Sequence, residues 1–365
     1  MRVGIIGVGI QGFKYLEMLL DNMPEYKVVA ITRLNDERKA KLGDKINSLK
    51  IYQSDEEMFK AIDNKEILLD AVIITTPHLR HEYDAIEAFK RGLMVLCDKP
   101  AGAYLSQGER MLEESHGLRY GFIFHQRAYP IYRRLYDLVH SGKYGSIKRY
   151  LYVVTDWYRI NEYYVKEAWR GKYKTDGGGV FMNQCPHSLD IMQHICGMPE
   201  SVYADLKFGK YHPIEVEDEG TIILRHKGYS GVFVTSTGET PGVNRFEIST
   251  DKALITCYKD RIVIKENEYM EDYYRNQRLE DFKNPEAKVV EEIIESNNQK
   301  AYIEIFKNFY NKVENLYVDG KEALNSLILS NAIYLSAFKN KEVKIPSSFD
   351  SFNKEFEEEI GKRIK

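Results

Sequence analysis

The stretch GIIGVGIQG, residues 4–12, sets the fold class of the N-terminal part of the chain. Its glycines have the G-x-G-x-x-G spacing, and the stretch stands between a predicted strand and a predicted helix. In such a turn the first glycine allows the tight bend, the second lets a pyrophosphate approach the backbone, and the third lets the helix pack on the strand. The phosphates then bind at the helix N-terminus. The predicted dinucleotide contacts here are Gly7, Gly9, Ile10, Gln11 and Gly12.

The first 124 residues alternate short apolar strands with amphipathic helices. Predicted strands cover residues 2–7, 27–32, 50–53, 70–76, 93–98 and 119–124. Apolar strands that alternate with helices form a parallel sheet covered on both faces. We therefore predict an α/β dinucleotide-binding domain over residues 1–124, with a doubly wound parallel sheet.

The rhythm changes after residue 125. A helix is predicted to start near residue 186, and consecutive strand-like runs separated by turn residues then fill residues 201–266. Such runs form an antiparallel or mixed sheet, so residues 125–365 are predicted to be an α+β domain for substrate binding. Helices over 299–315 and 320–339 are expected to close it, and the charged tail is expected to form a surface helix.

The composition excludes several classes of protein. A net charge of −3 gives no support for a nucleic-acid binder. No apolar run approaches the ~18 residues of a membrane helix, and the chain opens directly on a strand, so we expect no signal peptide. The four cysteines have no disulfide-framework or CxxC spacing, which is typical of reduced thiols. We expect a cytoplasmic protein.

The end of the second predicted strand bears on the choice of cofactor. Dinucleotide sites that prefer NAD normally carry an acid there to hold the ribose 2′-hydroxyl, but this chain has Thr32 and Arg33. A hydroxyl and a guanidinium suit a 2′-phosphate, so we predict NADP(H) in preference to NAD(H). In the alternative, Arg33 is a solvated loop residue and Asp36 or Glu37 reaches the ribose.

Lys99 follows the apolar strand of the stretch VLCDKPAG, residues 95–102. Open parallel sheets bind ligands at the carboxyl ends of their strands. A lysine there can hydrogen-bond a reacting hydroxyl, and a nearby nicotinamide cation would lower its pKa. The alternative is a surface lysine in a loop.

The stretch GGGVFMNQCPHSLD, residues 177–190, contains the most informative histidine, His187. Its three glycines either let the backbone approach a flat ligand or form a turn. A helix that starts at the proline would place His187, Asp190 and His194 on one side, which raises the possibility of a metal site. No fourth ligand is evident, and we predict no metal. A general acid/base is favoured over a structural histidine.

Taken together, these motifs resemble those of the glucose–fructose oxidoreductase / inositol dehydrogenase / rhizopine-catabolism (Gfo/Idh/MocA) family. The resemblance covers roughly residues 2–345. It rests on GIIGVGIQG, AVIITTPHLRH, VLCDKPAG, SGKYGSI, GGGVFMNQCPHSLD, IEVEDEG and NRFEIS, in that order. It implies a Rossmann domain and a C-terminal domain whose open sheet commonly forms dimer or tetramer contacts. It also implies oxidation of a sugar or cyclitol hydroxyl, or reduction of the ketone, with NAD(H) or NADP(H).

The resemblance implies a role for each matching residue. Lys99 takes the family's lysine role, and Asp98 replaces the usual Glu of its Glu-Lys-Pro motif. His187 would take the proton as hydride leaves the carbinol carbon. Asn183 stands where the family has an acid; an amide can orient a hydroxyl but cannot carry a proton. Lys99 and His187 therefore remain as the proton-handling pair.

Further positions complete the predicted site, and those beyond Thr32 and Arg33 are implied by the resemblance. Predicted cofactor contacts, besides those at the glycine turn, are Thr32, Arg33, Thr75, Thr76, Pro77, His81, Asp98, Lys99, Gln126 and Arg127. Predicted substrate contacts are Lys99, Arg127, Trp157, Tyr158, Trp169, Arg170, Asn183 and His187, and Arg159 is a further candidate. Aromatic faces suit sugar C–H surfaces and guanidinium groups suit hydroxyls or carboxylates, although these residues could instead pack a domain interface.

The predicted function is an NADP(H)-preferring oxidoreductase that interconverts a sugar or cyclitol alcohol and its ketone. We expect a homodimer or homotetramer that binds a small molecule, with no nucleic-acid or membrane partner. Two alternatives stay open. Some relatives cleave glycosides through transient oxidation with a tightly held dinucleotide, and a few are sensors that bind the dinucleotide without turnover.

Overall fold

A computed structural model describes residues 1–166, 169–313 and 315–364, so Glu167 and Ala168, which precede the predicted substrate contacts Trp169 and Arg170, lie outside the described residues. The chain divides into two compact units. The first unit comprises residues 1–125 and 299–327, and the second comprises residues 126–298 and 328–365. The break at residue 125 lies beside the predicted domain boundary.

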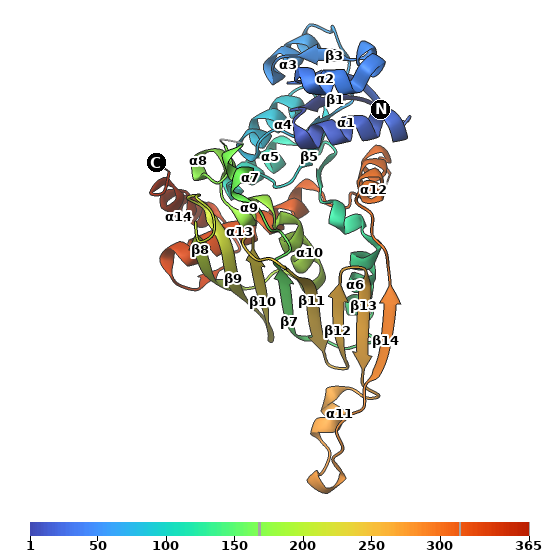
Figure 1. Cartoon of the computed structure of the whole chain (residues 1–365), viewed down its shortest axis with the longest axis vertical. Coiled ribbons are helices and arrows are strands. Elements are labelled where there is room, and N and C mark those ends of the chain that lie inside the picture. The colour runs from blue at the N-terminus through green and yellow to red at the C-terminus, as the bar shows by residue number, and fades with distance from the viewer. Residues whose placement is uncertain (167–168, 314, 365) are drawn as a thin grey trace. The chain divides into compact units, whose positions relative to one another are not determined.

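The first unit contains a six-stranded parallel sheet, as predicted. Its strand order is β3-β2-β1-β4-β5-β6, with the crossover next to β1. The strands are β1 (Arg2–Ile6), β2 (Lys27–Thr32), β3 (Lys50–Tyr52), β4 (Ala71–Ile74), β5 (Met94–Asp98) and β6 (Tyr120–Ile123) (Figure 1). The central strands β1 and β4 are buried almost throughout, which explains their continuous apolar runs.

Helices connect these strands, and two begin at side-chain caps. The Asn35 side chain accepts from the Arg38 N–H at the start of α2, and Ser54 accepts from the Glu57 N–H at the start of α3. The helices of this unit are α1 (Ile10–Asn22), α2 (Asp36–Leu42), α3 (Asp55–Asp63), α4 (His81–Phe89), α5 (Leu105–Glu114) and α12 (Asn298–Tyr310).

The predicted division of the chain assigns residues 299–327 to the second domain, and the structure differs from it here. These residues belong to the first unit. The Arg119 guanidinium, just before β6, donates to the carbonyl oxygens of Phe309 at 3.0 Å and Asn308 at 2.6 Å. The Tyr26 hydroxyl donates to the Phe306 carbonyl at 2.6 Å. Sequence order could not show this, because the contacts join residues far apart in the chain.

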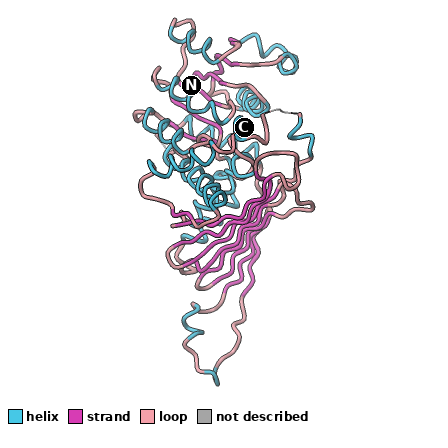
Figure 2. The backbone as a smooth tube through the Cα atoms, turned by 90° about the vertical axis from the view of Figure 1, so that its left-hand side faces the viewer, coloured by secondary structure: helices cyan, strands magenta, loops and turns pink. Residues whose placement is uncertain are grey.

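The second unit contains a nine-stranded mixed sheet in the order β14-β13-β12-β11-β7-β10-β9-β8-β15. Among the described strands of this second sheet, β7 and β10 pair in parallel and all other neighbours pair antiparallel. Its strands are β7 (Ile147–Val154), β8 (Ser201–Phe208), β9 (Glu217–His226), β10 (Tyr229–Ser236), β11 (Asn244–Thr250), β12 (Ala253–Tyr258), β13 (Arg261–Glu266), β14 (Lys288–Ile293) and β15 (Val343–Lys344). The tube in Figure 2 shows these strands lying edge to edge. The edge strand β14 escaped sequence analysis because half of its residues are charged and most of them are exposed.

Several helices of this unit pack on one face of the sheet. Helix α10 contacts α6 and β7, and α9 contacts β9. The helices of this unit are α6 (Pro130–His140), α7 (Asn161–Val165), α8 (Tyr173–Asp176), α9 (Val180–Asn183), α10 (Pro186–Cys196), α11 (Glu271–Arg275) and α14 (Asp350–Gly361). Helix α13 (Gly320–Lys339) begins in the first unit and ends in the second. The tail helix α14 is not merely a surface helix, because Phe352, Phe356 and Ile360 are buried along one face.

Across the part of the chain that the structure describes, no helix is long and apolar enough to cross a membrane.

Candidate active site

The glycine turn lies at the carboxyl end of β1. Gly7 has a φ of +88°, which L side chains rarely adopt, and a Cβ there would lie 2.8 Å from the Thr76 methyl. A Cβ at Gly12 would lie 2.7 Å from the Gly7 carbonyl oxygen, so that helix α1 packs closely on the turn. The nearest atom to a Cβ added at Gly9 would be the Gly7 carbonyl oxygen, 4.0 Å away. The backbone of Gly9 is therefore open to an approaching group.

The start of α1 fits a dinucleotide phosphate. Gly9 is the N-cap, and no side chain caps the helix. The uncapped N–H groups and the positive end of the helix favour an anion at this point. Ile10 beside them is 54% exposed although it is apolar. These residues suit the pyrophosphate of NAD(P), as the sequence predicts.

The position of Thr32 differs from the predicted contact with a cofactor 2′-phosphate. The Thr32 side chain is fully buried; the hydroxyl accepts from the Gly7 N–H at 2.9 Å and donates to Asp55 Oδ1 at 3.2 Å. Thr32 therefore supports the glycine turn from beneath instead of touching a 2′-phosphate. The residue type at the strand end could not reveal this, because its partner Asp55 lies beyond the next strand.

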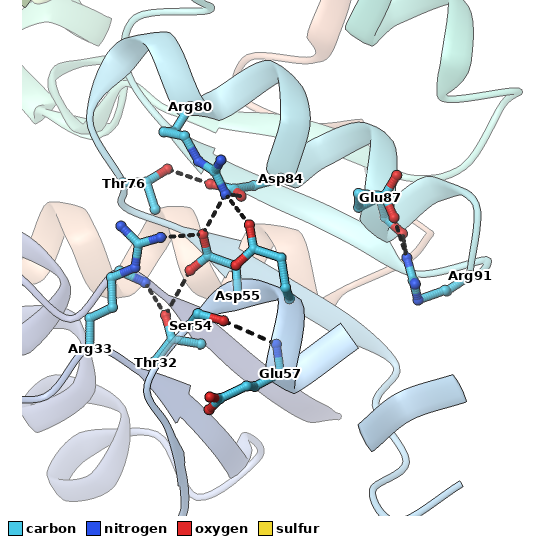
Figure 3. A network of polar contacts seen from close by, with 12 residues as sticks. Thr32, Arg33, Ser54, Asp55, Glu57, Thr76, Arg80, Asp84, Glu87 and Arg91 are labelled. Carbon is cyan, nitrogen blue, oxygen red and sulfur yellow. Dashed lines mark hydrogen bonds and ion pairs between the residues drawn. The ribbon is translucent and has the colours of Figure 1, made fainter. Parts of the chain in front are cut away.

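Arg33 is exposed at its tip and anchored by the same carboxylate. Arg33 Nη2 donates to Asp55 Oδ2 at 2.7 Å, and Arg80 Nη2 donates to the same oxygen at 2.8 Å. Figure 3 shows the two guanidinium groups converging on Asp55, Arg33 from the segment after β2 and Arg80 from the helical turn before α4. The pKa of the neighbouring Asp84 is raised to about 7, mainly by burial and to a smaller extent by the negative charge of Asp55. Asp55 thus fixes Arg33 while 41% of the Arg33 side chain stays exposed.

The two carboxylates of the alternative prediction form ion pairs on their own helix but stay largely exposed. Asp36 pairs with Lys39 at 3.2 Å and Glu37 pairs with Lys41 at 3.1 Å. Sequence analysis missed Arg38, which donates from Nη1 to the Val8 carbonyl at 3.4 Å and so lies beside the glycine turn.

Lys99 follows β5 at the same edge of the sheet and is half-buried. Asp98 Oδ1 accepts from the Lys99 backbone N–H at 3.1 Å and from the Tyr15 hydroxyl at 3.3 Å. Burial raises the pKa of Asp98 to about 6, although the Lys99 charge opposes the shift. Asp98 therefore links the loop that carries Lys99, which we call the lysine loop, to Tyr15 of helix α1.

His81 and Thr76 are corrected from cofactor contacts to buried supports. The His81 ring nitrogens lie 3.0 Å from the Pro100 carbonyl oxygen and 2.8 Å from that of Thr76. Only 1% of His81 is exposed, and burial lowers its pKa to about 4. The Thr76 hydroxyl donates to Asp84 at 2.7 Å. Together they join the loop after β4 to the lysine loop. Thr75 is half-buried and Pro77 is exposed.

In the second unit, His187 lies in the first turn of α10 and is 8% exposed. The glycines that precede it serve packing. A Cβ at Gly179 would overlap the Glu217 carbonyl oxygen, and one at Gly178 would overlap the Tyr334 hydroxyl. Glu217 accepts from the Gly179 N–H at 3.1 Å and the Phe181 N–H at 2.9 Å. Of the two predicted uses of these glycines, the structure supports the turn.

Asp176, which sequence analysis missed, lies beside Asn183. Asn183 Nδ2 lies 3.3 Å from Asp176 Oδ1 and 3.4 Å from Oδ2. Asp176 is 2% exposed and also accepts from the Gly171 N–H at 3.1 Å. The carboxylate that is absent at position 183 is therefore supplied next to it by α8. The sequence signal that could have identified Asp176 is its position directly before the three glycines, residues 177–179.

Arg127 is corrected from a predicted contact with cofactor and substrate to a buried ion pair. Its Nε and Nη2 donate to the two oxygens of Asp190 at 2.6 and 2.8 Å, and both side chains are nearly inaccessible. The pair fixes α10 one turn after His187. Gln126 is 9% exposed.

The residues considered for a metal do not converge. Asp190 is held by Arg127, and the His194 ring stacks on Tyr136 at 4.4 Å. Burial lowers the pKa of His194 to about 3. The structure describes no group of three His, Cys, Asp or Glu side chains arranged to hold a metal ion.

The predicted substrate residues of the β7–α8 segment gather around Tyr163. Arg159 and Arg170 lie over its ring, with guanidinium carbons 5.0 and 4.0 Å from the ring centre. Trp157 and Trp169 lie beside the two arginines, whereas Tyr158 is 46% exposed.

Comparisons with known proteins agree with this arrangement. Residues 1–120 match the oxidoreductase family with an NAD-binding Rossmann fold, and residues 132–256 match the GFO/IDH/MocA C-terminal domain.

Among curated relatives, myo-inositol 2-dehydrogenase of Thermotoga maritima is 25% identical over 70% of this chain and 74% of its own length. The rhizopine catabolism protein MocA of Rhizobium meliloti is 24% identical, over 54% of this chain and 57% of its own. The NADP(+) scyllo-inositol 2-dehydrogenase of Bacillus subtilis is 26% identical, over 56% of this chain and 54% of its own. The chain thus spans little more than half the length of these last two relatives.

Two solved structures share the fold. The WlbA dehydrogenase of Bordetella pertussis, in complex with NADH and UDP-GlcNAcA, has a TM-score of 0.77 and 24% identity, over 95% of this chain and 99% of its own. Levoglucosan dehydrogenase, in complex with NADH and levoglucosan, has a TM-score of 0.76 and 18% identity, over 95% of this chain and 100% of its own.

Proposed function

This chain belongs to the GFO/IDH/MocA oxidoreductase family, and we propose that it interconverts a secondary alcohol of a sugar or cyclitol and the corresponding ketone. NADP(H), when bound, supplies or accepts the hydride. The inositol dehydrogenases among the relatives support this class of substrate.

One observation carries the proposal. In the first unit, the open backbone at Gly9 and the side chain of Lys99 both follow strands of one parallel sheet, at its carboxyl edge. A dinucleotide on the glycine turn runs along that edge, which is where such sheets bind their ligands. A lysine on the same edge is suited to the oxygen of a reacting alcohol.

The roles follow from the chemistry of each side chain. We assign to Lys99 the hydrogen bond that polarises the reacting oxygen, and to His187 the proton of the carbinol hydroxyl. Asn183 orients a neighbouring hydroxyl, and Asp176 fixes the amide of Asn183 for that task. Asp190, bonded to Arg127, holds the helix that carries the histidine.

We expect Lys99→Met and His187→Ala each to lower the hydride-transfer rate by ~10²–10⁴-fold, because each removes a proton-handling group from the transition state. The dissociation constant of NADP(H) should stay nearly unchanged. Stopped-flow absorbance of NADPH with a polyol and keto-sugar panel measures the rate. Lys60→Met and His116→Ala, both exposed, are matched controls. A near-normal rate in either active-site variant would refute the role assigned to it.

The preference for NADP(H) rests on Arg33. Asp55 anchors the guanidinium while leaving its tip exposed, and the acids of α2 are paired with lysines. We expect Arg33→Ala to weaken NADPH binding about tenfold or more and to leave NADH binding unchanged, since only the 2′-phosphate contact is lost. Nicotinamide fluorescence titration measures both constants. Tighter binding of NADH than NADPH by the unaltered protein would contradict the preference.

Self-association through the nine-stranded sheet is part of the same proposal. The strand registers place four apolar residues in one row on one face, together with Glu247 and Thr256; the four are Ile223, Val232, Leu151 and Val263. Ile223 is 37% exposed. A sheet face with both apolar and charged residues suits a second copy of the chain, and the molecular mass in solution distinguishes a monomer from a dimer or tetramer. The four buried, free thiols are compatible with the cytoplasmic location that we propose.

A further inference from the structure

The residues around Tyr163 in the second unit form a cationic and aromatic group, which we call the arginine–tryptophan cluster. It consists of Trp157, Arg159, Tyr163, Trp169 and Arg170. The Arg170 guanidinium carbon lies 4.0 Å from the Tyr163 ring centre and 5.1 Å from that of Trp169. The Arg159 guanidinium carbon lies 5.0 Å from Tyr163 and 5.7 Å from Trp157. Aromatic faces hold each guanidinium in place without neutralising its charge.

The two arginines lack a carboxylate partner among the residues that the structure describes. Their guanidinium groups donate instead to backbone oxygens, from Arg170 Nη1 to Tyr163 at 3.1 Å and from Arg159 Nη1 to Tyr158 at 3.0 Å. The Nε atoms of both are buried and have no hydrogen-bond partner in the described part of the chain. Arg127 in the same unit, by contrast, is bonded through two nitrogens to Asp190. Partly desolvated cations without a counter-ion favour an incoming anion.

A cavity of about 490 Å³ opens beside Arg170. Arg170 and Lys172 give it positive charge, and Tyr164, Val165, Pro213 and Ile214 give it an apolar wall. Glu215 also lines the cavity, but its carboxylate accepts from the Tyr173 N–H at 2.7 Å. This combination suits a ligand with both an acidic group and a carbon skeleton.

The cavity is connected to the residues proposed for the reaction. Gly171 lines it, and the Gly171 N–H donates to Asp176, which accepts from Asn183. The Tyr163 hydroxyl accepts from Gln184 Nε2 at 3.3 Å, three residues before His187. These hydrogen bonds tie the cavity and the cluster to the segment that carries Asn183 and His187, as expected if one small molecule contacts both.

From these contacts we propose that the substrate carries an acidic group, a carboxylate or a phosphate, and that Arg159 and Arg170 bind it. The inference rests on the proposed function, because it names the class of sugar or cyclitol that the same site accepts. Lys172 adds long-range attraction at the exposed rim of the cavity.

Tryptophan fluorescence is a direct measure of binding at this site, because the only two tryptophans of the sequence, Trp157 and Trp169, both belong to the cluster. Tryptophan fluorescence of the full-length protein with saturating NADP⁺ is titrated with D-glucuronate, D-glucose 6-phosphate, D-glucose and inorganic phosphate. Ionic strength is held constant, so that screening does not change. We expect a saturable change with glucuronate or glucose 6-phosphate and none with glucose. The acid that binds more tightly identifies the group as carboxylate or phosphate.

Variants test the assigned residues. Arg170→Gln and Arg159→Gln should each raise the dissociation constant of the preferred acid about 10- to 100-fold, because each removes a charge-assisted hydrogen bond. Arg170→Lys should lie in between, since the charge stays and the planar fork is lost. Lys174→Met removes an exposed charge from neighbouring α8 and should leave the constant within about twofold. Urea unfolding verifies that each variant is folded.

Three results would overturn the inference: an equal response to glucose, no response to either acid, or inorganic phosphate binding as tightly as glucose 6-phosphate. Unchanged binding in both arginine variants would overturn it as well. A saturable titration that depends on the arginines, without hydride transfer to NADP⁺ from any substrate, would refute the proposed function while leaving the anion site standing.

Discussion

Two glycine-rich turns stand before helices in this chain, and the two units use them in opposite ways. In the first unit, the turn before α1 leaves the backbone of Gly9 open, because the nearest atom would lie 4.0 Å from an added Cβ. In the second unit, the turn before α9 is closed, because Gly178 and Gly179 face Tyr334 and Glu217 without room for a methyl group.

The difference lies in what fills the space beside the backbone. At Gly9 the space is left for a ligand, and the first N–H groups of α1 have no side-chain cap. At Gly179 the protein itself fills the space, and the carboxylate of Glu217 takes up the N–H groups of Gly179 and Phe181. The same residue type therefore permits ligand approach in one unit and close packing in the other.

The largest effect is expected at the closed turn. Gly179→Ala should lower the free energy of unfolding by about 3 kcal/mol or more, because the methyl overlaps the backbone of Glu217 and the strand cannot move aside. Urea unfolding followed by circular dichroism measures the loss. Gly361→Ala is the control, since no atom lies within 4 Å of its added carbon. A change at Gly179 as small as at Gly361 would remove the contrast between the turns.

A smaller effect, of a different kind, is expected at the open turn. Gly9→Ala should leave the unfolding free energy within about 0.5 kcal/mol, because the Gly9 φ of −77° suits alanine and the space is empty. NADPH binding should weaken about 10- to 100-fold, since the methyl stands where the pyrophosphate approaches. Calorimetric titration with NADPH measures this. Unchanged binding would show that the dinucleotide does not use this turn.

The smallest effect concerns the pH dependence of the closed turn. Burial raises the pKa of Glu217 from 4.5 to about 7, against the effect of its hydrogen-bond donors. The folded state therefore holds this proton more tightly than the unfolded chain, so stability falls as pH rises between these two values. Glu217→Gln does not titrate. The excess stability of the unaltered protein over this variant should shrink, by about 1 kcal/mol, between pH 5 and pH 6. An excess that is constant or grows with pH, measured by urea unfolding, would contradict the assignment.

Part of the candidate site could be predicted because its signals are local. The spacing of the glycine turn, the lysine after β5 and the proline before His187 each specify a backbone position within a few residues. The prediction failed for Thr32, His81 and Arg127, which are polar residues at the expected places but point into the interior. Their partners, Asp55, Pro100 and Asp190, lie between 19 and 63 residues away in the chain.

Amino-acid order alone was enough to predict the parallel sheet of the first unit, the mixed sheet of the second and the family. Periodicity and turn spacing suffice for these, because strands and helices form from neighbouring residues. The three-dimensional arrangement was needed to show that residues 299–327 join the first unit and that the Asp176 carboxylate lies beside Asn183. It was also needed to show which glycine turn is open. Burial of a side chain, and the space beside a glycine, depend on atoms brought together from distant parts of the chain.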